Sequence, residues 1–176
     1  MHGSEAPSDW VVRWAPQVKG GPVLDVACGG GRHAVLFRDR GLQVVAVDRQ
    51  PVALEGIQFV TADLEDGSPW PFAGRRFGAI VVANYLHRPL YPHLLGSLDE
   101  GGVLIYDTFM AGNERFGRPS NPAFLLRPGE LLDAFRELEV LGFEEGEVSE
   151  PKPAVKQRIC ARRSLEALRQ GLESRP

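Results

Sequence analysis

Cysteine is scarce in this sequence, and long apolar runs are missing. The two cysteines among the 176 residues, Cys28 and Cys160, are too few for a disulfide framework and lack metal-ligand spacing. No apolar stretch approaches membrane-spanning length, and the first residues lack the basic-then-apolar pattern of a secretory signal. We therefore expect a cytoplasmic protein with no metal site, no disulfide scaffold and no membrane span.

An excess of positive charge is also missing. The formal net charge is −3, and the only adjacent basic pairs are Arg75-Arg76 and Arg162-Arg163. This balance gives no general attraction to a phosphate backbone, so we do not expect a nucleic-acid partner. The composition, 43% hydrophobic and 24% charged, is that of an ordinary globular protein, and residues 1–176 are expected to form one domain. The oligomeric state cannot be predicted.

The sequence does contain a glycine-rich turn between an apolar strand and a helix. Residues 23–26 are rich in Val and Leu, glycines occupy positions 29–31, and a helical pattern follows. Such a turn brings a ligand close to backbone N–H groups at a helix N-terminus. Glycine suits it because glycine reaches positive φ and has no side chain to block the ligand.

Asp25 distinguishes this turn from a dinucleotide-binding turn. The run from Gly29 to Ala34 satisfies the pattern G-x-G-x-x-A, which is weak alone. A carboxylate in the preceding strand repels a pyrophosphate but attracts an ammonium group. The stretch resembles the first motif of class I S-adenosylmethionine-dependent methyltransferases, an acidic residue followed by a G-x-G turn. A βα turn without a ligand is the structural alternative.

A second acidic residue follows the next apolar run. Residues 43–48 predict a buried parallel strand that ends at Asp48, about 20 residues past the glycines, where a ribose diol would lie. This position resembles the second methyltransferase motif. Arg49 keeps a dinucleotide phosphate cofactor open as an alternative, because an arginine there could meet a 2′-phosphate.

Asp63 and Leu64 follow a predicted strand at 57–60 and resemble the third motif of the family. Asp63 is placed to accept from an adenine amino group, although it could equally be a surface turn residue. The connections on either side are short: residues 49–56 allow one helical turn with Pro51 at N1, and residues 66–76 predict a loop. In the family, longer helices usually form these two connections, so this sequence departs from the family pattern there.

Polar and aromatic residues follow the fourth and fifth predicted strands, at 77–83 and 103–109. Groups at the carboxyl ends of parallel strands mark where open α/β sheets bind ligands. Candidates for a catalytic base are His87, Tyr106 and Asp107, and Tyr85 is a candidate for contact with the substrate.

Two segments could cover the site. A helix over about 8–18 carries Trp10, Trp14 and Arg13; the tryptophans predict core packing, or else a lid in which Arg13 pairs with a carboxylate. The loop 110–127 contains Asn113 and Arg118, both candidates for contact with the substrate.

The end of the chain completes the predicted fold. Residues 128–138 predict a helix, 140–148 and 155–161 an antiparallel strand pair, and about 164–173 a last amphipathic helix. The fold class is therefore α/β, doubly wound, with a mostly parallel seven-stranded sheet and a C-terminal antiparallel pair, as the resemblance over residues 23–161 implies. Helices B and C of that fold are shortened or absent. The sequence is most similar to small bacterial members, which include the tellurite-resistance type.

The resemblance implies methyl transfer from S-adenosylmethionine to a small-molecule acceptor, with S-adenosylhomocysteine as product. Two alternatives remain: a non-catalytic S-adenosylmethionine-binding protein, and an NADP-dependent oxidoreductase. An RNA acceptor is a further variant. The predicted cofactor-binding residues are Arg13, Asp25, Ala27, Gly29, Gly31, Asp48, Arg49, Asp63, Leu64 and Asn84.

Overall fold

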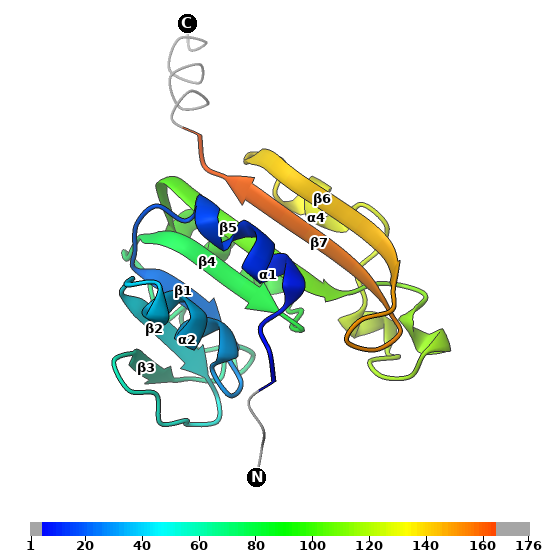
Figure 1. Ribbon diagram of the computed structural model, residues 1–176, viewed down its shortest axis with the longest axis horizontal. Helices are drawn as coiled ribbons and strands as arrows, with labels where there is room; N and C mark the ends of the chain where they lie inside the picture. The colour runs from blue at the N-terminus through cyan, green and yellow to red at the C-terminus, as the bar shows by residue number, and fades with distance from the viewer. Residues whose placement is uncertain (1–4, 165–176) are drawn as a thin grey trace, which may run out of the picture.

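The computed structural model describes residues 5–164 and contains one seven-stranded sheet in the order β3-β2-β1-β4-β5-β7-β6 (Figure 1). Strands β1 to β5 run parallel, and β7 lies antiparallel between β5 and β6. The predicted mostly parallel sheet with a C-terminal antiparallel pair is confirmed. Its strands are β1 (Val23–Val26), β2 (Val44–Asp48), β3 (Gln58–Thr61), β4 (Phe77–Ala83), β5 (Leu98–Phe109), β6 (Glu139–Val148) and β7 (Ala154–Arg162).

The central strands are buried on both faces, as their continuous apolar sequences predict. One core packs under α1 and α2, which lie on the face toward the viewer in Figure 1. The other core holds Trp70, Phe72 and the apolar residues of α3 and α4. The helices are α1 (Asp9–Trp14), α2 (Arg32–Asp39), α3 (Tyr91–Ser97) and α4 (Glu130–Ala134).

Helix α1 begins at Ser8, whose side chain accepts from the Val11 N–H, and a 3-10 turn (Ala15–Gln17) extends it. Trp10 is fully buried, and its indole N–H donates to the Ile159 carbonyl at 3.1 Å. The core-packing interpretation of Trp10 is therefore confirmed, and the interpretation of this tryptophan as a lid is wrong.

The two connections beside β3 contain no helix. Residues 49–57 and 62–76 form turns and irregular chain, so the predicted loss of helices B and C is confirmed, while the predicted helical turn at Pro51 is absent. Trp70 and Phe72 pack edge to face at 5.3 Å and fill the core on this side.

Other boundaries differ from the predictions. Strand β5 begins at Leu98, so Gly101 and Gly102 lie within it, and its pairing with β4 shifts register between Phe77 and Ala79. Helix α4 is only five residues long, and residues 135–138 form turns before β6 starts at Glu139. A second register shift lies in β6 between Val140 and Gly142. The predicted helix at 164–173 lies outside the described residues, apart from Ser164.

Candidate functional site

The glycine turn occupies the carboxyl end of β1, between the ends of β2 and β4. Val26 pairs with Val47 on one side and with Val82 on the other, so the turn lies beside Asp48 and Asn84. Three residues of the turn have positive φ: Ala27 at 53°, Gly29 at 55° and Gly31 at 86°. A Cβ at Gly31 would lie 2.6 Å from a methyl group of Leu54, which would have to shift, but the positive φ is what favours glycine there.

Asp48, the last residue of β2, binds the glycine turn through its side chain. One carboxylate oxygen accepts from the Gly29 N–H at 2.9 Å, and the other accepts from the Gln50 N–H at 2.9 Å. The carboxylate stays partly exposed, so it has lone pairs left for a ligand.

A cavity of about 450 Å³ opens over these strand ends. Within it lie seven residues predicted from the sequence, so the structure brings together groups from the ends of β1, β2, β3 and β4. The lining residues are Ala27, Asp48, Arg49, Ala62, Asp63, Leu64, Glu65, Asn84, Tyr85 and Phe124.

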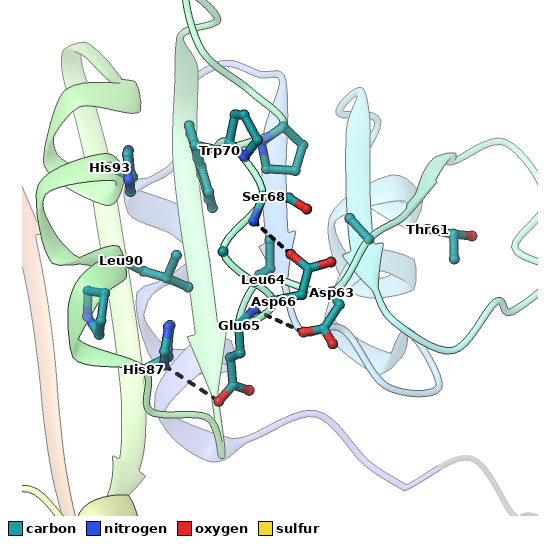
Figure 2. A pocket seen from close by; sticks show the side chains of 15 residues that line it. Thr61, Asp63, Leu64, Glu65, Asp66, Ser68, Trp70, His87, Leu90 and His93 are labelled. Atoms are coloured by element: carbon teal, nitrogen blue, oxygen red, sulfur yellow. Dashed lines mark hydrogen bonds and ion pairs between the residues drawn. The ribbon is translucent and has the colours of Figure 1, made fainter.

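A second cavity, of about 660 Å³, lies beside the first and shares residues 62–65 with it (Figure 2). Figure 2 shows His87 and Glu65 facing each other, with His87 Nδ1 3.5 Å from Glu65 Oε1. The other Glu65 oxygen accepts from the Tyr85 hydroxyl at 3.2 Å. Glu65 therefore joins Tyr85 in the first cavity to His87 in the second.

Asp25 lies beneath the turn and does not line the cavity. It is 2% exposed, and Oδ2 accepts from the Ala34 N–H at 3.0 Å, near the start of α2. Burial raises the pKa of this carboxyl from 3.8 to about 7, while the Ala34 N–H and Arg32 oppose the shift. Burial also raises the pKa of the neighbouring Cys28 thiol to about 12, which favours the neutral thiol.

A buried charge cluster occupies the ends of β5 and β7. One oxygen of Asp107 lies 3.1 Å from Lys156 Nζ and 3.2 Å from Arg158 Nε, and the other accepts from the Ser8 hydroxyl at 2.6 Å. Lys156 also donates to Asn84 Oδ1 at 2.7 Å. Burial lowers the pKa of Lys156, and the charge of Asp107 opposes this shift.

The N-terminal segment closes over this cluster. The Ser8 N–H donates to His33 Nε2 at 2.9 Å, which requires that nitrogen to be unprotonated. Burial lowers the pKa of His33 to about 4, and Arg32 contributes to the shift. Ser8 therefore joins α1 to both α2 and β5.

Besides Asp25 and Asp107, four predicted site residues lie elsewhere or are already occupied. The Tyr106 hydroxyl is buried in the core and donates to the Tyr85 carbonyl, and burial raises its pKa, so Tyr106 is wrongly assigned as a base. The Asn113 amide donates to the Pro119 carbonyl and accepts from the Val155 N–H, so it supports the loop. Arg13 pairs with Glu144 on β6. Arg118 is exposed on the loop and lines neither of the two cavities.

Sequence reasoning missed Glu65, Lys156 and Arg158. The signal for the two cations was present, because charged residues stand near the start of a predicted strand that ends in an apolar run. An antiparallel partner of β5 must begin where β5 ends, so its first residues reach the ligand-binding edge. Among residues 5–164, no group of three or more His, Cys, Asp or Glu could hold a metal ion. Within the same range, no helix is long and apolar enough to cross a membrane.

Residues 2–118 match a protein family described as a methyltransferase domain. Among curated sequences, the chain is 26% identical over 145 residues to ribosomal RNA small subunit methyltransferase H of Gemmatimonas aurantiaca. This alignment covers 80% of the chain but only 46% of that relative, so the chain spans less than half of the relative's length.

Two solved structures are similar in fold. TehB from Haemophilus influenzae gives a TM-score of 0.68 at 17% identity, over 87% of this chain and 61% of that one. N-methyltransferase NodS from Bradyrhizobium japonicum, in complex with S-adenosyl-l-homocysteine, gives a TM-score of 0.65 at 15% identity, over 87% and 83% of the two chains.

Proposed function

Because the chain belongs to the methyltransferase domain family, we propose that it transfers a methyl group from S-adenosylmethionine to a small-molecule acceptor. The observation that carries this proposal is the single cavity over the ends of β1 to β4, which holds Asp48, Asp63 and Asn84 together. Its volume lies within the range of cofactor sites. The similar NodS structure is a complex with the demethylated cofactor.

In this proposal the cofactor lies with its adenine toward β3 and its methionine part toward β4. Asp48 accepts from the ribose hydroxyls, and Asp63, at the end of β3, accepts from the adenine amino group. The glycine turn and Asn84 then face the methionine part. The carboxylates of Asp48 and Asp63 keep exposed oxygens for these bonds. Leu64 and the stem of Arg49 provide apolar surface for the adenine ring.

The cofactor supplies an activated methyl group, so the protein chiefly has to align the acceptor in a site without water. Tyr85 and Phe124 line the cavity and are candidates for contact with the acceptor. Where the acceptor must lose a proton, Glu65 accepts it, because Glu65 lines the cavity and contacts Tyr85 and His87. Asp107 is not assigned this role, because two cations and Ser8 already occupy its oxygens.

Calorimetric titration tests the cofactor. S-adenosylmethionine and S-adenosylhomocysteine should bind the wild type, and Asp48→Ala should abolish binding. The matched control is Asp66→Ala, which removes an exposed carboxylate from the neighbouring cavity and should leave binding unchanged. Binding of NADP(H) alone would reject the proposal in favour of the oxidoreductase.

Methyl transfer is tested with radiolabelled S-adenosylmethionine against panels of small amines, thiols and hydroxyl compounds. Labelling of a small molecule supports the proposal. An rRNA acceptor is the second candidate, because the curated relative is named as an rRNA methyltransferase. Labelling of small-subunit rRNA, with salt-sensitive RNA binding, would favour that candidate instead. Cofactor binding without transfer to any acceptor would favour the non-catalytic alternative.

A further inference from the structure

We propose that Asn84 binds the carboxylate of the cofactor's methionine part and that Lys156 is the positioning residue that orients Asn84 for this contact. This inference rests on the function proposed above. It replaces Arg13, which the sequence suggested as the partner of a carboxylate and which pairs with Glu144 on β6 instead.

The register of the sheet brings Asn84 to the methionine end of the cavity. Asp48 lies on the β2 side of the glycine turn and Asn84 lies on the β4 side, because Val26 pairs with both Val47 and Val82. With adenine at Asp63 on β3 and ribose at Asp48 on β2, the methionine part extends across the turn toward β4. Asn84 is exposed at this end and lines the cavity.

Lys156 determines which way the Asn84 amide faces. An ammonium group has donors only, so the atom 2.7 Å from Nζ is the amide oxygen. The amide NH2 is therefore turned away from Lys156, and within residues 5–164 it makes no hydrogen bond. Two donors remain for a group that accepts hydrogen bonds, as a carboxylate does.

Both partners are fixed before a ligand arrives. Lys156 has an 11% exposed side chain, lies 3.1 Å from Asp107 and stands over the Phe109 ring at 4.5 Å. The Asn84 backbone has φ 53°, and its N–H donates to the Asp107 carbonyl at 2.8 Å. A preformed donor pair binds its ligand without first losing side-chain entropy.

The charge nearest the Asn84 amide is positive, because Lys156 Nζ lies 2.7 Å from the amide oxygen. The carboxylates that line other parts of the cavity belong to Asp48, Asp63 and Glu65. Arg158 pairs with Asp107 and lies 4.0 Å from Glu144, so two carboxylates already balance its charge. Lys156 is therefore the cation that favours an anionic ligand group at Asn84.

The test compares S-adenosylmethionine with its decarboxylated form, which differs by the one carboxylate. Both are titrated calorimetrically into the wild type, Lys156→Met and Asn84→Gly. Each variant should bind S-adenosylmethionine about tenfold or more weakly, as expected for a lost charge-assisted hydrogen bond. Each should bind the decarboxylated form within about twofold of the wild type. The double variant should lose no more than either single variant, because Lys156 acts through Asn84.

Arg158→Met is the matched control, because it removes another, partly buried cation from Asp107 but not the contact with Asn84. It should leave the preference for the carboxylated ligand unchanged. Asn84→Gly keeps the test valid if Lys156→Met unfolds, since glycine accepts the backbone conformation at this exposed position. If the Lys156 and Asn84 variants lose affinity equally for both ligands, or lose none, this inference is overturned while the proposed function stands. Failure of the wild type to bind S-adenosylmethionine overturns the proposed function as well.

Discussion

The two halves of the ligand-binding edge are built differently. At the ends of β2, β3 and β4, the carboxylates of Asp48 and Asp63 and the amide of Asn84 are exposed or partly exposed around a cavity. At the ends of β5 and β7, Asp107 and Lys156 are buried and paired with each other, and the N-terminal segment covers them through Ser8.

This difference separates groups that meet a ligand from groups that hold the site in shape. Removing an exposed carboxylate changes the free energy of unfolding little. Leaving a buried charge without its partner lowers that free energy by several kcal/mol. The first half should therefore respond to mutation mainly in binding and the second half mainly in stability, except at Lys156, which contacts Asn84 in the first half. The following experiments test that division.

The largest effect is expected at Asp107. Asp107→Ala leaves Lys156 and Arg158 buried without their shared partner and should lower the free energy of unfolding by about 3–5 kcal/mol. Asp48→Ala should lower it by about 1 kcal/mol or less while abolishing cofactor binding. Urea denaturation measures both. Equal losses of stability in the two variants would contradict the division.

Asp25 should make stability depend on pH. Its pKa is about 7 in the folded protein against an ordinary value of 3.8 in the unfolded chain, so the folded protein binds more protons between these values. Stability therefore falls as pH rises from about 4 to about 7, by roughly 2–4 kcal/mol. Asp25→Asn should remove this fall in denaturation curves recorded across that range. A wild type and a variant with parallel pH profiles would show that Asp25 is not buried as described.

His33 should act in the opposite direction. Its pKa is about 4 when folded against an ordinary value of 6.5 when unfolded, so the unfolded chain binds more protons between these values. Stability is then full above pH 6.5 and is lost as pH falls toward 4, by roughly 1–3 kcal/mol. His33→Gln should remove this loss of stability at acid pH. The effect is seen most clearly in an Asp25→Asn background, because Asp25 changes stability in the opposite direction over the same pH range. An NMR titration that placed the His33 pKa near its ordinary value would refute the prediction.

Arg13 should have the smallest effect. Its ion pair with Glu144 is solvent-exposed, so Arg13→Ala should change stability by less than about 1 kcal/mol. It should leave the affinity for S-adenosylmethionine unchanged in calorimetry. A tenfold loss of affinity in Arg13→Ala would instead support the sequence-based prediction that Arg13 binds the cofactor.

The parallel strands could be predicted well from the sequence because their buried apolar runs end at polar residues or glycines. Strand β4 was predicted to the residue, and Asp48, Asp63 and Asn84 were all placed at one edge. The carboxyl ends of parallel strands all lie at the same edge of the sheet. Polar residues that follow several such strands can therefore be placed close together from the sequence alone.

Partnerships between distant residues could not be predicted in the same way. Lys156 and Asn84 are 72 positions apart, and Ser8 and Asp107 are 99 apart, so no local pattern connects them. Tyr106 illustrates the opposite error: its place near a strand end suggested a base, yet the alternation of β5 turns its ring into the core. Helix α4 was predicted too long because residues 135–138 form turns between the helix and β6, although their sequence continues the helical pattern.

The two outer strands of the sheet also differ in how they could pair with another chain. An open edge presents unpaired backbone groups that can join another chain, as in aggregation. Strand β3 offers only four residues for such pairing. Strand β6 is longer, but its register shift near Gly142 and its glutamates at 144, 145 and 147 work against a flat, uncharged edge. Loss of those glutamates would make β6 the first place to look for intermolecular β-structure.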